Sequence, residues 1–162
     1  MIQREFLFSP RVLVIEDNAM NRELVVDVLT PAGFLILEAD SAEVGIEIAF
    51  AHPPDLILMD IALPGLDGLE ATILLKANAK TAHIPVVALT AHAMHGDELR
   101  ARGAGCIGFI TKPLDTRTLA QQIFLFLEKG EDAEKRPDLR LVKPSGTVFR
   151  SSSIEAGARS KL

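Results

Sequence analysis

The chain has 162 residues, 48% of them hydrophobic and 24% charged, which is the composition of an ordinary globular protein with room for one domain and an appendage. Its single cysteine, Cys106, excludes an intramolecular disulfide and a cysteine-rich metal site. The net charge of −5 argues against general nucleic-acid binding, which needs a basic surface.

Neither a membrane span nor a secretion signal is visible in the sequence. No apolar run approaches the roughly 20 residues that cross a bilayer. The segment 1–8 contains an acid, Glu5, and its apolar stretch is too short for a signal peptide. We therefore expect a cytoplasmic protein that does not bind membranes.

Five short apolar runs recur along the chain and predict strands. Most are continuous rather than alternating, which is typical of parallel strands that are covered on both faces. The runs are 12–15, 34–37, 56–59, 85–89 and 106–110. Apolar stripes with helical spacing lie between them, as in Met20–Leu29, Ala42–Phe50 and Leu119–Leu127.

Helix starts are indicated by an acid followed by a second acid three residues later. Asp40 with Glu43, and Asp67 with Glu70, have this capping pattern. Strands that alternate with helices predict an α/β fold with a parallel sheet and right-handed crossovers. Five such units fit a flavodoxin-like (βα)5 doubly wound sheet with strand order 2-1-3-4-5.

Polar residues follow four of the five predicted strands. Glu16 and Asp17 follow the first, Asp60 the third, Thr90 the fourth and Lys112 the fifth. In this fold, ligands bind at the carboxyl ends of the strands, near the first and third. Clustered carboxylates repel one another, and a raised pKa or a bound cation relieves the repulsion. Oxygen ligands suit Mg²⁺, the usual companion of phosphoryl groups, and an aspartate can itself accept a phosphoryl group.

Four motifs resemble, in order and in spacing, the receiver domain of two-component response regulators. They are Glu16-Asp17, the segment 55–68 (DLILMDIALPGLDG), Thr90-Ala91 and Lys112-Pro113. The resemblance covers about residues 10–128. The segment 90–98 (TAHAMHGDE) is most similar to receivers of hybrid kinases and of stand-alone cell-cycle regulators.

The resemblance implies a role for each residue at the strand ends. Asp60 accepts a phosphoryl group from a phosphohistidine. Mg²⁺ is the implied cofactor, with a ligand set of Glu16, Asp17, Asp60 and the backbone carbonyl of Ala62. Thr90 bonds a phosphoryl oxygen, and Lys112 pairs with the phosphoryl charge.

The resemblance also implies a conformational switch and the protein partners that recognise it. Phe109 occupies the position of the family's aromatic switch residue, which turns inward as Thr90 moves, and Pro113 follows a cis peptide. The changed face is that of the fourth helix, fifth strand and fifth helix. The implied partners are a sensor histidine kinase or a histidine phosphotransfer protein, or both, and a downstream protein target. The protein is then a monomer or a phosphorylation-dependent dimer through that face, and it binds no nucleic acid.

Other function classes stay open beside this one. A degenerate receiver would act as an interaction module without phosphorylation. An aspartyl-phosphate phosphatase also uses a nucleophilic aspartate, but such enzymes usually have a second Asp where Ala62 stands. A flavin carrier on the same fold is disfavoured by the acids after the first strand. We expect a signalling protein rather than an enzyme, one that assists its own phosphorylation and dephosphorylation.

The charge is unevenly divided along the chain. Residues 1–128 contain 9 Lys or Arg and 17 Asp or Glu, whereas residues 129–162 contain 8 and 5. The second segment is rich in proline, glycine and serine and cannot bury enough apolar surface to order itself. We therefore expect an N-terminal extension (1–9), a receiver domain (10–128) and a basic, mostly disordered tail (129–162). The tail is either a passive extension or an interaction segment.

Overall fold

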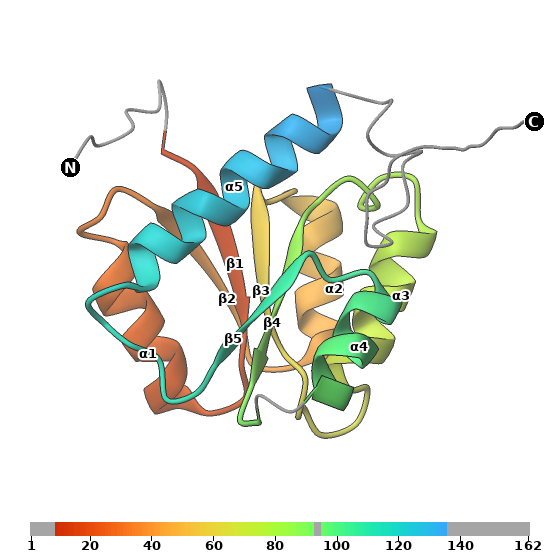
Figure 1. Cartoon of the computed structure of the whole chain (residues 1–162), viewed down its shortest axis with the longest axis horizontal. Helices are drawn as coiled ribbons and strands as arrows, with labels where there is room; N and C mark the ends of the chain where they lie inside the picture. Colours follow the sequence, from red (N-terminus) through yellow and green to blue (C-terminus); the bar gives the residue numbers. More distant parts are fainter. Residues whose placement is uncertain (1–8, 93–94, 136–162) are drawn as a thin grey trace, which may run out of the picture. The chain divides into compact units, whose positions relative to one another are not determined.

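The computed structural model describes residues 9–92 and 95–135, and it contains five strands that alternate with five helices (Figure 1). The strands are β1 (Arg11–Ile15), β2 (Leu35–Ala39), β3 (Leu56–Asp60), β4 (Val86–Thr90) and β5 (Gly108–Thr111). The helices are α1 (Ala19–Leu29), α2 (Ala42–Ala51), α3 (Gly68–Ala77), α4 (His95–Ala104) and α5 (Leu119–Lys135).

All five strands belong to one parallel sheet in the order β2-β1-β3-β4-β5, which confirms the predicted topology. The register aligns the ends of neighbouring strands: Asp60 lies beside Leu89, and Thr90 lies beside Thr111. Because parallel strands all point the same way, the residues that follow them meet at one edge of the sheet. The sheet therefore places the polar strand ends together.

The helices cover both faces of the sheet, as the continuous apolar runs predict. Along β1, the side chains alternate: Leu13 and Ile15 belong to the core under α2, α3 and α4, whereas Val12 and Val14 belong to the core under α1 and α5. Figure 1 shows α1 and α5 on one side of the sheet and the other three helices on the opposite side. All of β3 is buried, so Asp60 ends a strand that has no solvent-facing side.

The helix caps confirm one predicted start and correct another. Asp67 and Glu70 form a complete capping box at α3. At α2, however, the cap is Ser41, whose hydroxyl accepts a hydrogen bond from the backbone N–H of Val44 at 3.2 Å, and not Asp40. Serine and aspartate are about equally good N-cap residues, so two adjacent candidates cannot be separated by the pattern alone.

Helix α5 extends to Lys135, which is seven residues beyond the expected end of the domain at 128. The segment 129–135 is highly charged, which favoured a tail, but five of its seven residues are Glu, Lys or Ala, which are strong helix formers. The predicted tail beyond Lys135 and most of the predicted N-terminal extension lie outside the described residues. Of the helices within the described ranges, none is long and apolar enough to cross a membrane.

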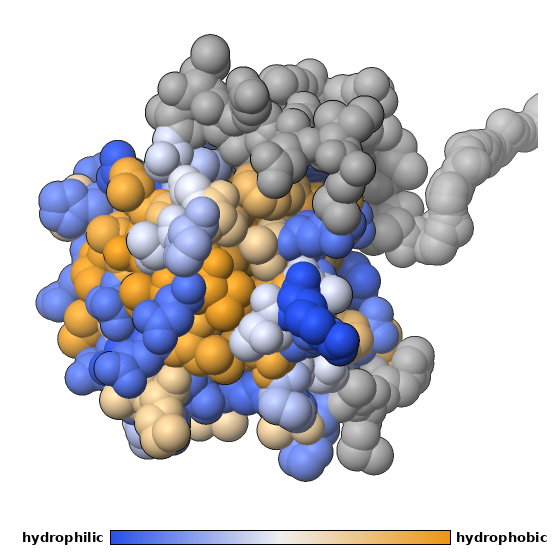
Figure 2. Space-filling model, turned by 90° about the vertical axis from the view of Figure 1, so that its left-hand side faces the viewer, coloured by the Kyte–Doolittle hydropathy of each residue, from blue (hydrophilic) through white to orange (hydrophobic). Residues whose placement is uncertain are grey.

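Apolar side chains reach the surface beside the edge strand β2. Leu35, the first residue of this strand, is 56% exposed, and Val44 on the neighbouring helix α2 is also exposed. Figure 2 shows apolar side chains gathered on the side of the molecule where β2 and α1 lie in Figure 1. Farther along the same strand, the exposed charged residue Glu38 interrupts the apolar edge, as is common in edge strands.

Gly68 is the residue at which α3 packs against the end of β3. It begins α3, and a Cβ atom built on it would lie 2.7 Å from the Cα of Ile61 and closer still to the backbone carbonyl oxygen of Asp60. These neighbours are backbone atoms, which cannot rotate away. Only glycine lets the first turn of α3 pack this closely against the residue at the strand end.

We expect Gly68→Ala to lower the free energy of unfolding by about 1–3 kcal/mol, the usual cost of overpacking a core. Gly103→Ala is the matched control, because a Cβ at Gly103 in α4 meets no described atom within 4 Å. Alanine there should raise stability by about 0.5–1 kcal/mol through its helix propensity. Urea unfolding followed by circular dichroism measures both changes, and equal effects for the two variants would contradict the close approach at Gly68.

Candidate functional site

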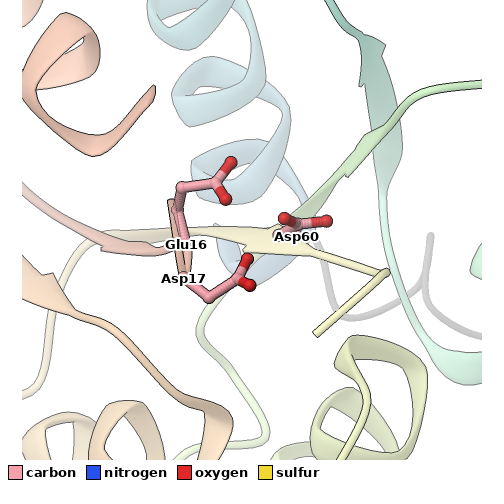
Figure 3. A group of neighbouring side chains, drawn as sticks. All are labelled: Glu16, Asp17 and Asp60. Atoms are coloured by element: carbon pink, nitrogen blue, oxygen red, sulfur yellow. The ribbon is translucent and has the colours of Figure 1, made fainter. Parts of the chain in front are cut away.

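Three carboxylates meet at the carboxyl edge of the sheet. Glu16 and Asp17 directly follow β1, and Asp60 is the last residue of β3. One oxygen from each side chain lies within 4.8 Å of the other two. Figure 3 shows the three side chains turned toward a common space. The structure therefore brings together the three acids that the sequence analysis singled out.

The three acids differ in exposure. Glu16 is 1% exposed and Asp60 is 3% exposed, whereas Asp17 is open to solvent. Burial raises the pKa of Glu16 above its ordinary value, and the nearby carboxylate of Asp60 raises it further. Glu16 and Asp60 therefore form the buried part of the site, and Asp17 forms the part that solvent reaches.

Lys112 supplies the opposing charge. Its Nζ atom lies 2.7 Å from Glu16 Oε1 and 2.9 Å from Asp60 Oδ2. Burial lowers the pKa of Lys112, but the pairing with the two carboxylates outweighs this effect, and the net pKa is raised. The backbone N–H of Lys112 donates to the carbonyl of Thr90 at 2.7 Å, which holds Lys112 beside the end of β4. Its peptide bond to Pro113 is cis.

The carboxylate of Asp60 is fixed at both oxygens. Oδ1 accepts a hydrogen bond from the backbone N–H of Ala62 at 2.9 Å, and Oδ2 accepts one from Lys112 Nζ. Ala62 itself is exposed in the loop that follows β3. The backbone N–H of Ala62 thus lies against the acid, and the role expected of its carbonyl stays a prediction.

Thr90 and Phe109 lie nearby on the last two strands. Thr90 is buried at the end of β4, where its hydroxyl donates to the carbonyl of His92 at 2.9 Å and accepts from the N–H of His92 at 3.1 Å. Phe109 is half-buried against the core under α2, α3 and α4. The Thr90 hydroxyl is therefore bound within the β4–α4 loop, and the aromatic ring lies on the same side of the sheet as α4.

The donor set fits a hard divalent cation such as Mg²⁺. All three side chains offer carboxylate oxygens, the ligands that this ion prefers. Among the residues that the structure describes, none donates a hydrogen bond to Glu16 Oε1, although this atom is buried. Its positive neighbour is Lys112 Nζ, 2.7 Å away. A carboxylate oxygen has more than one lone pair, so a single contact with an ammonium leaves room for another positive partner.

Two residues that hold Glu16 were not singled out from the sequence. The backbone N–H of Asn18 donates to Glu16 Oε2 at 3.1 Å, and Arg22 Nη1 donates to the backbone carbonyl of Glu16 at 2.8 Å. Both lie in or just before the first turns of α1. Their position in the sequence could have indicated them, because a helix that begins directly after a strand-end acid places its first residues close to that acid.

Comparison with known proteins agrees with this geometry. The chain matches the family model of the response regulator receiver domain over residues 12–124. The polar-differentiation response regulator DivK of Brucella ovis is 41% identical over 116 residues, which cover 72% of this chain and 94% of that protein. DivK of Brucella anthropi is 40% identical over 116 residues, which again cover 72% of this chain and 94% of that protein.

Solved structures also resemble the chain. The receiver domain of a sensor histidine kinase from Pseudomonas aeruginosa, determined with a magnesium ion coordinated in its active-site cleft, superposes with a TM-score of 0.68. It is 28% identical, and the match covers 74% of this chain and 98% of that one. The chemotaxis protein CheY4 of Vibrio cholerae has a TM-score of 0.70 at 21% identity, with 73% and 98% coverage, and shows the shared fold.

The sequence identity to DivK and the match to the receiver-domain model over residues 12–124 indicate the same family. The chain belongs to the response regulator receiver domains of two-component signalling, and among them it is similar to the DivK receivers.

Proposed function

We propose that this protein is a phosphorylation-controlled signalling protein in which Asp60 accepts a phosphoryl group from a phosphohistidine. The observation that carries the proposal is the buried Asp60 carboxylate, which is flanked by two further acids and paired with Lys112 at 2.9 Å. This arrangement supplies a nucleophile, ligands for a cation and a positive charge for the phosphoryl group in one place.

In the transfer, a carboxylate oxygen of Asp60 attacks phosphorus, and the bond between phosphorus and the donor imidazole breaks. The imidazole nitrogen leaves with the bonding electron pair and is protonated, and an acyl phosphate forms on Asp60. Glu16, Asp17, Asp60 and the carbonyl of Ala62 would hold Mg²⁺, which neutralises phosphoryl charge when it is bound. Lys112 pairs with a phosphoryl oxygen and keeps the product anchored.

The phosphoryl group adds a charge of about −1.5 to −2 at the end of β3. The Thr90 hydroxyl then moves from the carbonyl of His92 to a phosphoryl oxygen, which changes the β4–α4 loop. Phe109, only half-buried beside α4, moves inward with it. Because the hydroxyl binds different partners in the two states, phosphorylation can shift the balance between them.

The partners follow from the same chemistry. A sensor histidine kinase or a histidine phosphotransfer protein supplies the phosphohistidine, and a downstream protein reads the face of α4, β5 and α5, through which a phosphorylation-dependent dimer can also form. Such partners place the protein in the cytoplasm, as a signalling protein that assists its own phosphorylation and dephosphorylation.

Two alternatives are less well supported. A phosphatase of the aspartyl-phosphate type would need a second acid at position 62, where a methyl side chain stands, and the backbone N–H of Ala62 bonds Asp60 directly. A receiver that works without phosphorylation would not need the buried acids and Lys112 to be kept together. The family to which the chain belongs favours the phosphoacceptor role.

The direct test of the proposal is Asp60→Asn. After incubation with a small phosphodonor such as phosphoramidate and Mg²⁺, the wild-type protein should gain the mass of one phosphoryl group in intact-mass spectrometry, and Asp60→Asn should gain none. Asp27→Asn, which changes an exposed acid on α1, is the matched control and should be labelled like the wild type. Equal labelling of Asp60→Asn would refute the acceptor assignment.

Lys112 should matter most when no metal is bound. Lys112→Met leaves two buried carboxylates without their counter-charge, and we expect it to lower the free energy of unfolding by about 3–5 kcal/mol in EDTA. Saturating Mg²⁺ should stabilise the variant more than the wild type, because the ammonium no longer repels the cation. Thermal unfolding with and without Mg²⁺ measures this difference.

Lys80→Met is the control for Lys112→Met, because Lys80 is exposed and lies away from the acids along the chain. It should leave both the stability and the response to Mg²⁺ unchanged. If Lys112→Met gained no more from Mg²⁺ than the wild type does, the ammonium and the cation would not share one site.

Thr90 should be needed for the switch and not for the chemistry. Thr90→Val keeps the shape of the side chain and removes the hydroxyl, so Asp60 should still be labelled. Beryllium fluoride, a stable mimic of the phosphoryl group, should then change the amide NMR signals of α4 much less than in the wild type. Thr90→Ser retains the hydroxyl and should respond as the wild type does, and a full response of Thr90→Val would disprove this role.

A further inference from the structure

Arg22 joins the ends of two neighbouring strands beside the carboxylates. From α1, its Nη1 donates to the backbone carbonyl of Glu16 at 2.8 Å, and its Nε donates to Glu38 Oε1 on β2 at 3.3 Å. The side chain is mostly covered, with 21% exposure. One guanidinium thus holds the point at which the chain leaves β1 and also binds the adjacent edge strand.

The carbonyl that Arg22 binds controls the direction of two metal-site residues. The backbone N–H of Glu16 makes a sheet bond to Ala39 at 3.0 Å, and the chain then turns toward Asn18, the cap of α1. The carbonyl of Glu16 belongs to the planar peptide that joins Glu16 to Asp17. Fixing its oxygen therefore fixes the peptide plane, and with it the directions in which the Glu16 and Asp17 side chains leave the backbone.

Asp17 depends most on this contact. Glu16 is also held by burial, by Asn18 and by Lys112, whereas Asp17 is exposed and follows the sheet bond by one residue. Without Arg22, the peptide could rotate and carry the Asp17 carboxylate out of the group of three. The affected property is the arrangement of the acids and not the packing of the core.

The chemistry of the contact requires arginine. The guanidinium presents donors in a rigid planar fork, so Nη1 and Nε can bind two acceptors in different directions at once. A lysine has a single point charge on a flexible stem and cannot reproduce both bonds. The Glu38 side chain is 47% exposed, and ion pairs that reach the solvent add little to stability. The pair with Glu38 is thus better explained as aiming Arg22 than as stabilising the fold.

We infer that Arg22, oriented by Glu38, is a positioning residue that sets the cation affinity of the Glu16–Asp17–Asp60 group. The inference rests on the proposed function in one respect, namely that these three acids hold Mg²⁺. Residues that orient metal ligands without touching the metal typically change metal affinity by about 10–100-fold when they are removed.

The test measures Mg²⁺ binding by isothermal titration calorimetry with no phosphodonor present. We expect Arg22→Ala to raise the dissociation constant by about 10–100-fold, Arg22→Lys to recover little of the loss, and Glu38→Gln to show a smaller change in the same direction. Arg100→Ala is the matched control, since Arg100 in α4 pairs with Asp97 on its own helix and should leave the affinity unchanged. Circular dichroism verifies that each variant is folded.

A second readout separates positioning from a general structural role. In a Mg²⁺ titration of phosphoramidate labelling, Arg22→Ala should need more Mg²⁺ for half of its maximal rate and should reach nearly the wild-type maximum. An unchanged Mg²⁺ affinity in Arg22→Ala, or a lower maximal rate at unchanged affinity, overturns the inference. If Arg22→Ala weakens Mg²⁺ binding but wild-type Asp60 is not labelled, the inference holds and the proposed phosphoryl transfer fails.

Discussion

The repulsion among Glu16, Asp17 and Asp60 is the constraint on which the rest of the site depends. With oxygens within 4.8 Å of one another, each like-charge pair costs at least about 3.5 kcal/mol at an effective dielectric of 20. Burial makes the cost higher for Glu16, whose pKa is raised. Lys112 offsets part of this energy by pairing with two of the acids, and the remaining negative charge is what makes the site ready for a cation and then for a phosphoryl group.

The fold supplies the forces that keep the acids together. Parallel β1 and β3 are neighbours in the sheet, so their carboxyl ends present Glu16 and Asp60 at the same edge. Gly68 lets α3 pack directly on the backbone at Asp60, and Arg22 ties the end of β1 to β2. The energy of two packed cores, one on each face of the sheet, is what holds an arrangement that electrostatics alone would separate.

Much of this could be predicted from the sequence, because the determining signals are local. Continuous apolar runs followed by acids indicate buried strands and their ends, and the Asp67–Glu70 spacing identifies the start of α3. The wrong cap arose where a local rule has two solutions, since Ser41 and Asp40 are equally good caps. The charged residues after Glu128 suit a helix as well as a tail, and α5 continues through them to Lys135. Arg22 was missed because its acceptor is a backbone carbonyl, which leaves no mark in the sequence, and because Glu38 is brought near only by the pairing of β1 with β2.

The central claim is that the acid at the end of β3 forms the acyl phosphate. Borohydride reduces an aspartyl phosphate to homoserine, so treating the labelled protein with borohydride and mapping its peptides by mass spectrometry locates the modified residue directly. We expect homoserine at position 60 and unmodified aspartate at position 17. Homoserine at position 17, or its absence from position 60 in protein that carries the phosphoryl group, would contradict the account.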